Sequence, residues 1–79
     1  MALRPSARNR LPGIVMGVKL GEVMAQIDVR VGDNHMVSLI SREAAEELEI
    51  QEGDSVLVVV KATDVMVARI DDEDLHHGV

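Results

Sequence analysis

The sequence contains no cysteine and none of the aromatic residues Phe, Tyr and Trp. Without cysteine, the chain can form neither a disulfide nor a thiolate–metal site. Without aromatic rings, it lacks surfaces on which nucleic-acid bases stack, and a net charge of −6 leaves no excess of cations for phosphates. These absences argue against a protein that binds nucleic acid.

Long apolar runs and catalytic motifs are also missing. No run approaches the length of about 18 residues that a membrane span needs, and no signal-peptide pattern is visible. No serine lies in a nucleophile-elbow motif, and no glycine-rich loop could hold a phosphate. We therefore expect a cytoplasmic, non-enzymatic protein that does not enter a membrane.

Aliphatic residues are abundant for a chain of this size. The 79 residues suffice for one small domain, and hydrophobic residues make up 47% of them. A domain this small buries only about 60% of its unfolded surface, so part of this aliphatic content must stay at the surface of a single copy. Large exposed apolar patches are rare on monomers, which predicts a homo-oligomer.

Five segments are predicted as strands and one as a helix. Residues 22–31 show the clearest strand pattern, an alternation of apolar and polar residues over ten positions. Val56–Val60 is a continuous aliphatic run, which is typical of a strand buried on both faces. Ser41 is expected to cap a helix over 42–49 with a buried stripe of Ala44, Ala45 and Leu48. The predicted strands are 11–19, 22–31, 35–40, 55–61 and 65–70, with a bend or bulge at Gly13 and Gly17 and a hairpin turn at 32–34.

This order of elements favours an all-β fold with a small helical contribution. Three strands, a helix and two strands suit a five-stranded OB-like Greek-key barrel, with the short helix between strands three and four. A barrel with a swapped hairpin is the alternative. We expect one domain over residues 1–70 and a disordered acidic tail over 71–79.

Two short segments at the ends of predicted strands could together hold an oxyanion. Ser6 and Arg8 are two apart on an extended chain, so a hydroxyl and a guanidinium would point the same way. Lys61 and Thr63 follow the fourth predicted strand and offer a second cation and a second hydroxyl. With the backbone N–H groups of Ala7, Ala62 and Thr63, this set suits a tetrahedral oxyanion because every contact is a donor.

Each of these features also has a plainer interpretation. The first ten residues could be a frayed terminus, and Lys61 could be an ordinary surface lysine. Ser41 could bind an anion at the helix start or act only as a cap. His76 and His77 are adjacent in the acidic tail and do not share a face of a regular element, so no metal site is expected.

The motifs together resemble the molbindins, the Mop or TOBE-type molybdate-binding domains. The resemblance runs from about Ser6 to Ile70, and the tail beyond Ile70 departs from the family pattern. It rests on Ser6-Ala7-Arg8-Asn9 before the first strand, Ile40-Ser41 before the helix, Glu52-Gly53, and Lys61-Ala62-Thr63-Asp64-Val65-Met66.

The resemblance implies a ligand, a fold and an assembly. The ligand would be molybdate or tungstate, bound between the subunits of an OB-like hexamer built as a trimer of dimers, and a second class of anion site would lie on the threefold axis. By resemblance, Ser6, Ala7 and Arg8 would come from one subunit, and Ser41, Lys61, Ala62 and Thr63 would complete the pocket. The implied role is molybdenum storage or homeostasis. The alternative is a regulatory or interaction module of a molybdate transport or molybdate-responsive system.

Overall fold

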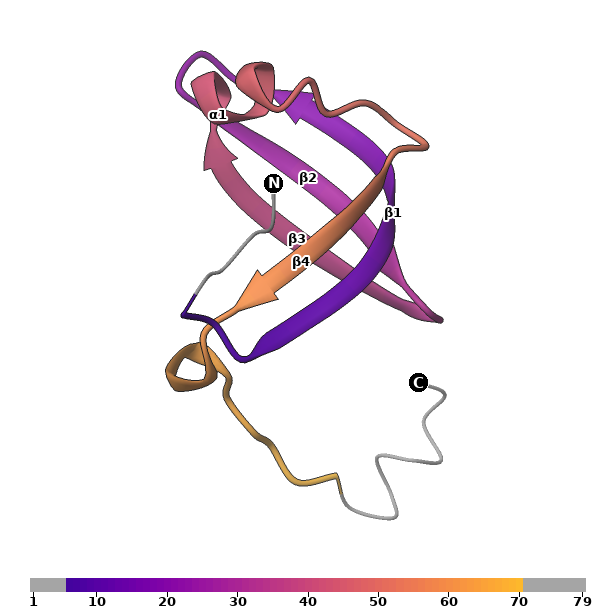
Figure 1. Cartoon of the computed structure of the whole chain (residues 1–79), viewed down its shortest axis with the longest axis vertical. Helices are drawn as coiled ribbons and strands as arrows, with labels where there is room; N and C mark the ends of the chain where they lie inside the picture. The colour runs from indigo at the N-terminus through magenta and orange to yellow at the C-terminus, as the bar shows by residue number, and fades with distance from the viewer. Residues whose placement is uncertain (1–5, 71–79) are drawn as a thin grey trace.

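In the computed structural model, which describes residues 6–70, four strands form one antiparallel sheet in the order β3-β2-β1-β4 (Figure 1). The sheet is curled, and one short helix sits at the end of β3. The elements are β1 (Asn9–Leu20), β2 (Met24–Val31), β3 (Asn34–Ser41), α1 (Arg42–Glu47), β4 (Ser55–Val60) and a 3-10 turn, η1 (Ala62–Asp64).

The long strand β1 holds the sheet together because it pairs with both β2 and β4. Its first half pairs with β4, from Asn9 opposite Val60 onward, and its second half pairs with β2. The register with β2 shifts between Val15 and Gly17, which confirms the predicted bulge at Gly17, whereas the register with β4 runs through Gly13 without a shift. A bulge increases the local twist of a strand, so the two halves of β1 can follow the curl of the sheet.

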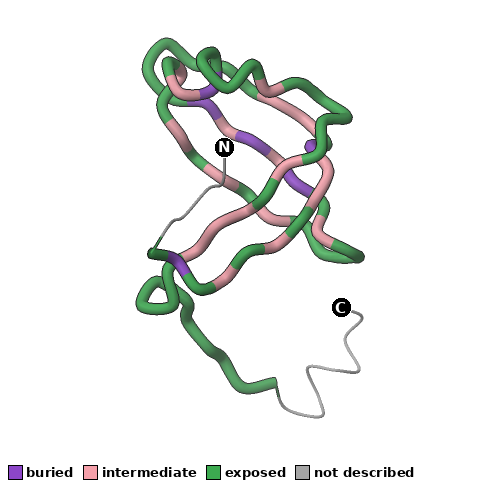
Figure 2. The backbone as a smooth tube through the Cα atoms, viewed as in Figure 1, coloured by how far each residue is buried: buried purple, intermediate pink, exposed green. Residues whose placement is uncertain are grey.

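The core lies on the inner face of β2. Ala25, Ile27 and Val29 are 1–3% exposed, as the alternating pattern predicts, and Val15 of β1 and Ala45 of α1 pack with them (Figure 2). Every member of this cluster is aliphatic and none is larger than isoleucine. A core this small contributes little hydrophobic free energy, since that term grows with the apolar area buried.

The turns and the helix cap follow local sequence signals. The β2–β3 hairpin turns through Gly32 at φ +60°, a conformation that glycine adopts without strain. The hydroxyl oxygen of Ser41 accepts a hydrogen bond from the N–H of Ala44 at 3.0 Å, which confirms Ser41 as the N-cap of α1. The helix ends at Glu47, two residues earlier than predicted, and Leu48 is 67% exposed rather than part of a buried stripe.

The prediction of a five-stranded barrel is wrong for the single chain, which forms a four-stranded open sheet. Residues 65–70 form no strand, and Met66 and Val67 are 93% and 94% exposed. Val56–Val60 is not buried on both faces either: Leu57 is 43% exposed, and the other four residues are only partly buried. The aliphatic pattern correctly indicated apolar segments, but in a single chain no other element packs over them.

Two further expectations concern parts of the chain beyond the sheet. The predicted acidic tail, 71–79, with His76 and His77, lies outside the described residues. Within residues 6–70, no helix has both the length and the apolar composition that crossing a bilayer requires.

The close approach of β1 to β2 at Gly13 gives a test of the fold. A Cβ atom at Gly13 would lie 2.6 Å from Cγ1 of Val29 and 2.7 Å from the carbonyl oxygen of Arg30. Gly13→Ala should therefore lower the free energy of unfolding by about 1–3 kcal/mol, the usual effect of overpacking. Gly17→Ala is the matched control, because its Cβ would meet nothing closer than a carboxylate oxygen of Asp28 at 3.9 Å. Urea denaturation measures both; equal stabilities of the two variants would contradict this packing.

Candidate functional site

The start of β1 and the end of β4 meet at one end of the sheet. Asn9 is opposite Val60 in the register, and its side-chain amide donates a hydrogen bond to the carbonyl oxygen of Val60 at 3.2 Å. The residues just before Asn9 and just after Val60 are therefore brought to the same end of one chain (Figure 1). The two predicted half-sites, 6–8 and 61–63, are neighbours without the help of a second subunit.

The residues before β1 alternate between buried and exposed. Ala7 is 5% exposed, whereas Ser6 and Arg8 on either side of it are exposed. A buried residue between two exposed ones fixes the direction of an extended chain, so the hydroxyl and the guanidinium project to the same side. The alternating burial agrees with an extended chain at these positions, and the joint role of the two side chains stays a prediction.

The residues after β4 form a tight turn. The N–H of Asp64 donates to the carbonyl oxygen of Lys61 at 2.9 Å, and the N–H of Val65 donates to that of Ala62 at 3.3 Å. These two bonds hold the backbone of the turn and leave the N–H groups of Ala62 and Thr63 out of use. Residues 61–63 are exposed, so an anion beside them would find a lysine, a hydroxyl and two backbone donors.

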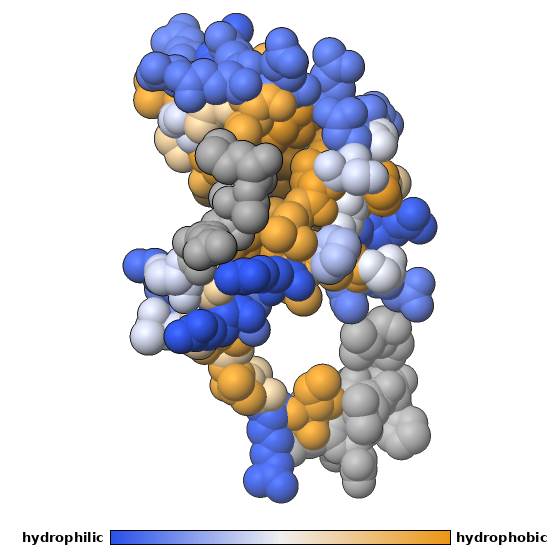
Figure 3. Space-filling view, viewed as in Figure 1, coloured by the Kyte–Doolittle hydropathy of each residue, from blue (hydrophilic) through white to orange (hydrophobic). Residues whose placement is uncertain are grey.

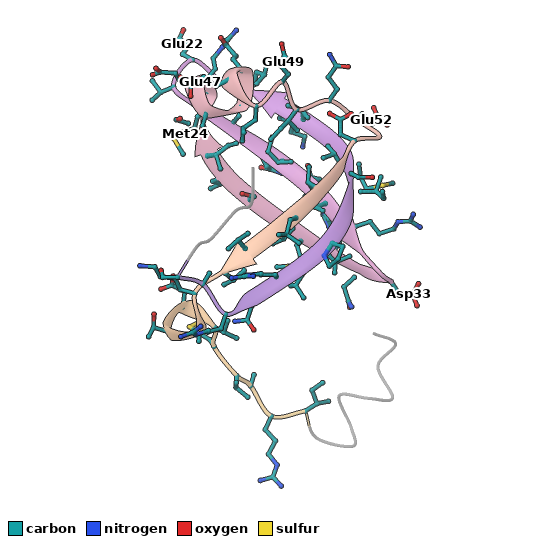
Figure 4. All side chains as sticks on the ribbon, viewed as in Figure 1. Glu22, Met24, Asp33, Glu47, Glu49 and Glu52 are labelled. Atoms are coloured by element: carbon teal, nitrogen blue, oxygen red, sulfur yellow. The ribbon has the colours of Figure 1, made fainter. Side chains whose placement is uncertain are left out.

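Positive charge is concentrated at this end, although the whole chain is acidic. Residues 6–10 and 60–64 contain Arg8, Arg10 and Lys61 but only one acidic residue, Asp64. Within residues 6–70, neither Arg8 nor Lys61 makes an ion pair. Acidic side chains lie elsewhere: Figure 4 shows Glu22, Glu47 and Glu49 around α1, Glu52 in the loop before β4, and Asp33 at the β2–β3 hairpin.

Ser41 does not join the other site residues within one chain. It lies at the end of β3 beside α1, at the opposite end of the sheet from η1 (Figure 1). Its hydroxyl oxygen accepts from the N–H of Ala44, so its O–H proton is still available to donate. Ser41 can therefore cap the helix and contact an anion at once, but it can share an anion with Arg8 only through another copy.

His35 takes part in a pair on the outer face of the sheet. Its Nε2 lies 2.8 Å from a carboxylate oxygen of Asp28, and the side-chain amide of Gln26 donates to the same carboxylate at 3.3 Å. The hydrogen bond from His35 lowers the pKa of Asp28, with smaller contributions from Gln26 and from the charge of Lys19. No cluster of metal-binding side chains occurs among residues 6–70, and His35 is accounted for by this pair.

Asn9 is a positioning residue to which the sequence analysis gave no role. It ties β1 to β4 where the half-sites meet, because its amide bonds the last carbonyl group of β4. The sequence feature that could have indicated this role is the position of Asn9 directly after Arg8 in the motif 6–9. An asparagine before an apolar strand is, however, equally typical of a turn.

Comparison with known proteins gives consistent matches. The TOBE domain model matches residues 5–67. The chain is 46% identical over 63 residues to molybdenum-pterin-binding protein 2 of Clostridium pasteurianum, covering 78% of this chain and 93% of that protein.

Two solved structures share the fold. A molybdate binding protein from Sporomusa ovata superposes with a TM-score of 0.81 at 31% identity, covering 85% of this chain and all of that one. The cytoplasmic molybdate-binding protein ModG, in a form with molybdate bound, gives a TM-score of 0.72 at 34% identity, covering 76% of this chain and 43% of that one.

Proposed function

This chain belongs to the TOBE domain family, and on that premise we propose that it binds molybdate or tungstate as the free oxyanion. The observation that carries the proposal is the pairing of Asn9 with Val60, which brings Arg8 and Lys61 to the same end of the sheet in an otherwise acidic protein. The names of its relatives refer to molybdenum or molybdate, which supports this choice of anion.

The donors at this end match the chemistry of a tetrahedral dianion. Molybdenum in molybdate already holds four oxygens, so the protein need not coordinate the metal and needs only to donate hydrogen bonds and balance charge. Arg8 supplies a forked guanidinium, and Lys61 supplies a point charge. The hydroxyls of Ser6 and Thr63 and the backbone N–H groups of Ala7, Ala62 and Thr63 supply the remaining donors.

The composition favours an inorganic anion over a pterin, although a relative's name includes a pterin. Pockets for flat organic rings are lined mainly by hydrophobic and aromatic side chains. This chain has no aromatic residue, and the exposed residues of 6–8 and 61–63 are polar or small. They suit a small hydrated dianion better than a ring system.

A second subunit is needed to enclose the anion. In one chain these residues are open to water, where a charge pair gains only about 1 kcal/mol at contact distance. Covering the site with another copy would lower the local dielectric constant and bring in Ser41. We propose a hexamer, arranged as a trimer of dimers, that stores or buffers molybdate in the cytoplasm without catalysing a reaction.

Calorimetric titration with molybdate, tungstate and sulfate tests the function. The assembled protein should bind molybdate and tungstate saturably. Arg8→Ala should weaken binding by about 2 kcal/mol or more, or about thirtyfold, because it removes a charged donor from the contact. Arg30→Ala is the matched control: it removes the same exposed side chain from β2 and should leave the affinity unchanged.

Two results would count against this function. Absence of saturable molybdate binding by the assembled wild-type protein rejects the proposal itself. Equal affinities of Arg8→Ala and wild type would keep the function but remove Arg8 from the site.

Ser41→Asp separates the two roles of Ser41. Aspartate is about as good an N-cap as serine, so the free energy of unfolding should change by only a few tenths of a kcal/mol. Its carboxylate would repel an oxyanion, so molybdate binding should fall by about tenfold or more. Urea denaturation and calorimetric titration of the same preparation measure the two effects. A stable variant with unchanged affinity would show that Ser41 serves the helix alone.

A further inference from the structure

Ser41 lines a cleft that is rich in carboxylates. The cleft has a volume of about 370 Å³ and lies between the β1–β2 turn and the start of α1. Its charged lining consists of Arg42, Glu22, Glu43 and Glu46. Figure 3 shows hydrophilic side chains gathered over this end of the molecule. Three carboxylates and one guanidinium therefore surround Ser41, which is an unfavourable setting for an oxyanion.

The backbone fixes Ser41 within this cleft. Ser41 is opposite Met24 in the terminal register pair of β2 and β3, and its hydroxyl oxygen accepts from the N–H of Ala44. The N–H of the next residue, Arg42, donates to the carbonyl oxygen of Val23 at 2.7 Å. The charges of the cleft are therefore a constant part of the surroundings of the Ser41 hydroxyl.

The guanidinium of Arg42 is held in place by contacts on two sides. Its Nε donates to a carboxylate oxygen of Glu46 at 2.6 Å, and its Nη1 donates to the carbonyl oxygen of Gly21 at 3.1 Å. A guanidinium is a planar, rigid fork of donors, so these two bonds fix where its charge lies. Arg42 thus bridges the β1–β2 turn and α1.

The ion pair matters more for the local charge than for the stability of the fold. The side chains of Arg42 and Glu46 are 44% and 59% exposed, and an exposed ion pair contributes little to stability. Glu22 and Glu43 make no ion pair among residues 6–70, so Arg42 is the cation that offsets the carboxylates of the cleft. Each carboxylate left without such an offset would repel a dianion near Ser41, most strongly where a second copy excludes water.

We propose that Arg42 offsets the carboxylate charge around Ser41, so that Ser41 of one copy can contact an oxyanion held by Arg8 and Lys61 of another. Arg42 acts through its charge and does not touch the anion. The inference rests on the proposed function, because it concerns how the Ser41 side of that same site tolerates a dianion.

A charge-matched pair of variants tests this role by calorimetric titration. Arg42→Ala leaves Glu46 unpaired in the cleft and should raise the dissociation constant for molybdate by about fivefold or more. Arg42→Ala/Glu46→Gln removes one charge of each sign, so the net charge of the cleft returns to that of the wild type. Its affinity should recover to within about twofold of wild type, because the lost ion pair was exposed.

Ionic strength separates charge from structure in the same variants. At about 1 M salt, charges are screened over about 3 Å, so the difference between Arg42→Ala and wild type should largely disappear. The loss of the hydrogen bond to Gly21 would instead persist at high salt and in the double variant. A double variant as weak as Arg42→Ala, or a difference that salt does not reduce, would overturn the proposal.

Removing a carboxylate tests the same argument without disturbing Arg42. Glu43 lines the cleft and is exposed, so Glu43→Gln should lower the dissociation constant for molybdate by about threefold. Glu52→Gln is the matched control: it makes the same change in the exposed loop before β4 and should leave the affinity unchanged. Equal affinities of these two variants would also overturn the proposal.

The wild-type titration distinguishes this inference from the function on which it rests. Absence of saturable molybdate binding by the wild type would reject both. Wild-type binding that Arg42→Ala leaves unchanged would keep the proposed function and reject the role of Arg42. Urea denaturation of each variant shows whether it is folded under the conditions of the titration.

Discussion

The structure depends on an aliphatic sheet face that a single chain leaves partly uncovered. The innermost positions of β2 are sealed by Val15 and Ala45, but the hollow between β3 and β4 stays open. Hydrophobic free energy grows with the apolar area removed from water, so burying the apolar residues that line this hollow would stabilise the protein further. Without aromatic residues or disulfides, the chain has few other means of stabilising so small a core. Association with further copies is the simplest way to bury the apolar hollow between β3 and β4.

The same requirement explains how an acidic chain could hold a dianion. The pairing of Asn9 with Val60 sets Arg8 and Lys61 at one end of the sheet, while many of the acidic side chains lie around α1 and at the hairpin tip. Charges facing water are screened, and their attraction for an anion rises steeply once a second surface excludes solvent. Subunit contact would therefore complete the apolar core and the charged site together. This coupling favours a site that lies between subunits.

The sequence predicted local structure well and the closure of the fold poorly. The period of two in β2 located Ala25, Ile27 and Val29 in the core, and Ser41 was recognised as a cap because its chemistry acts within four residues. Residues 65–70 were predicted as a strand of the same chain, and Leu48 as buried, yet both are exposed in the single chain. An apolar pattern indicates that a side chain is to be buried, but it does not indicate whether the residues that bury it belong to the same chain or to another copy. For the site, residue chemistry singled out 6–8 and 61–63 as donor segments. That the two segments lie together at one end of a single chain, and that Ser41 lies far from them, required the structure.

We propose that assembly of the chain and anion binding are one linked equilibrium. Sedimentation velocity of the wild-type chain, with and without molybdate at several protein concentrations, tests it most directly. A ligand held between subunits binds the assembled form better than the separated chains, so molybdate should move dissociation to lower protein concentration. A chain that stays monomeric at every concentration while binding molybdate, or an assembly whose dissociation molybdate does not affect, would contradict it.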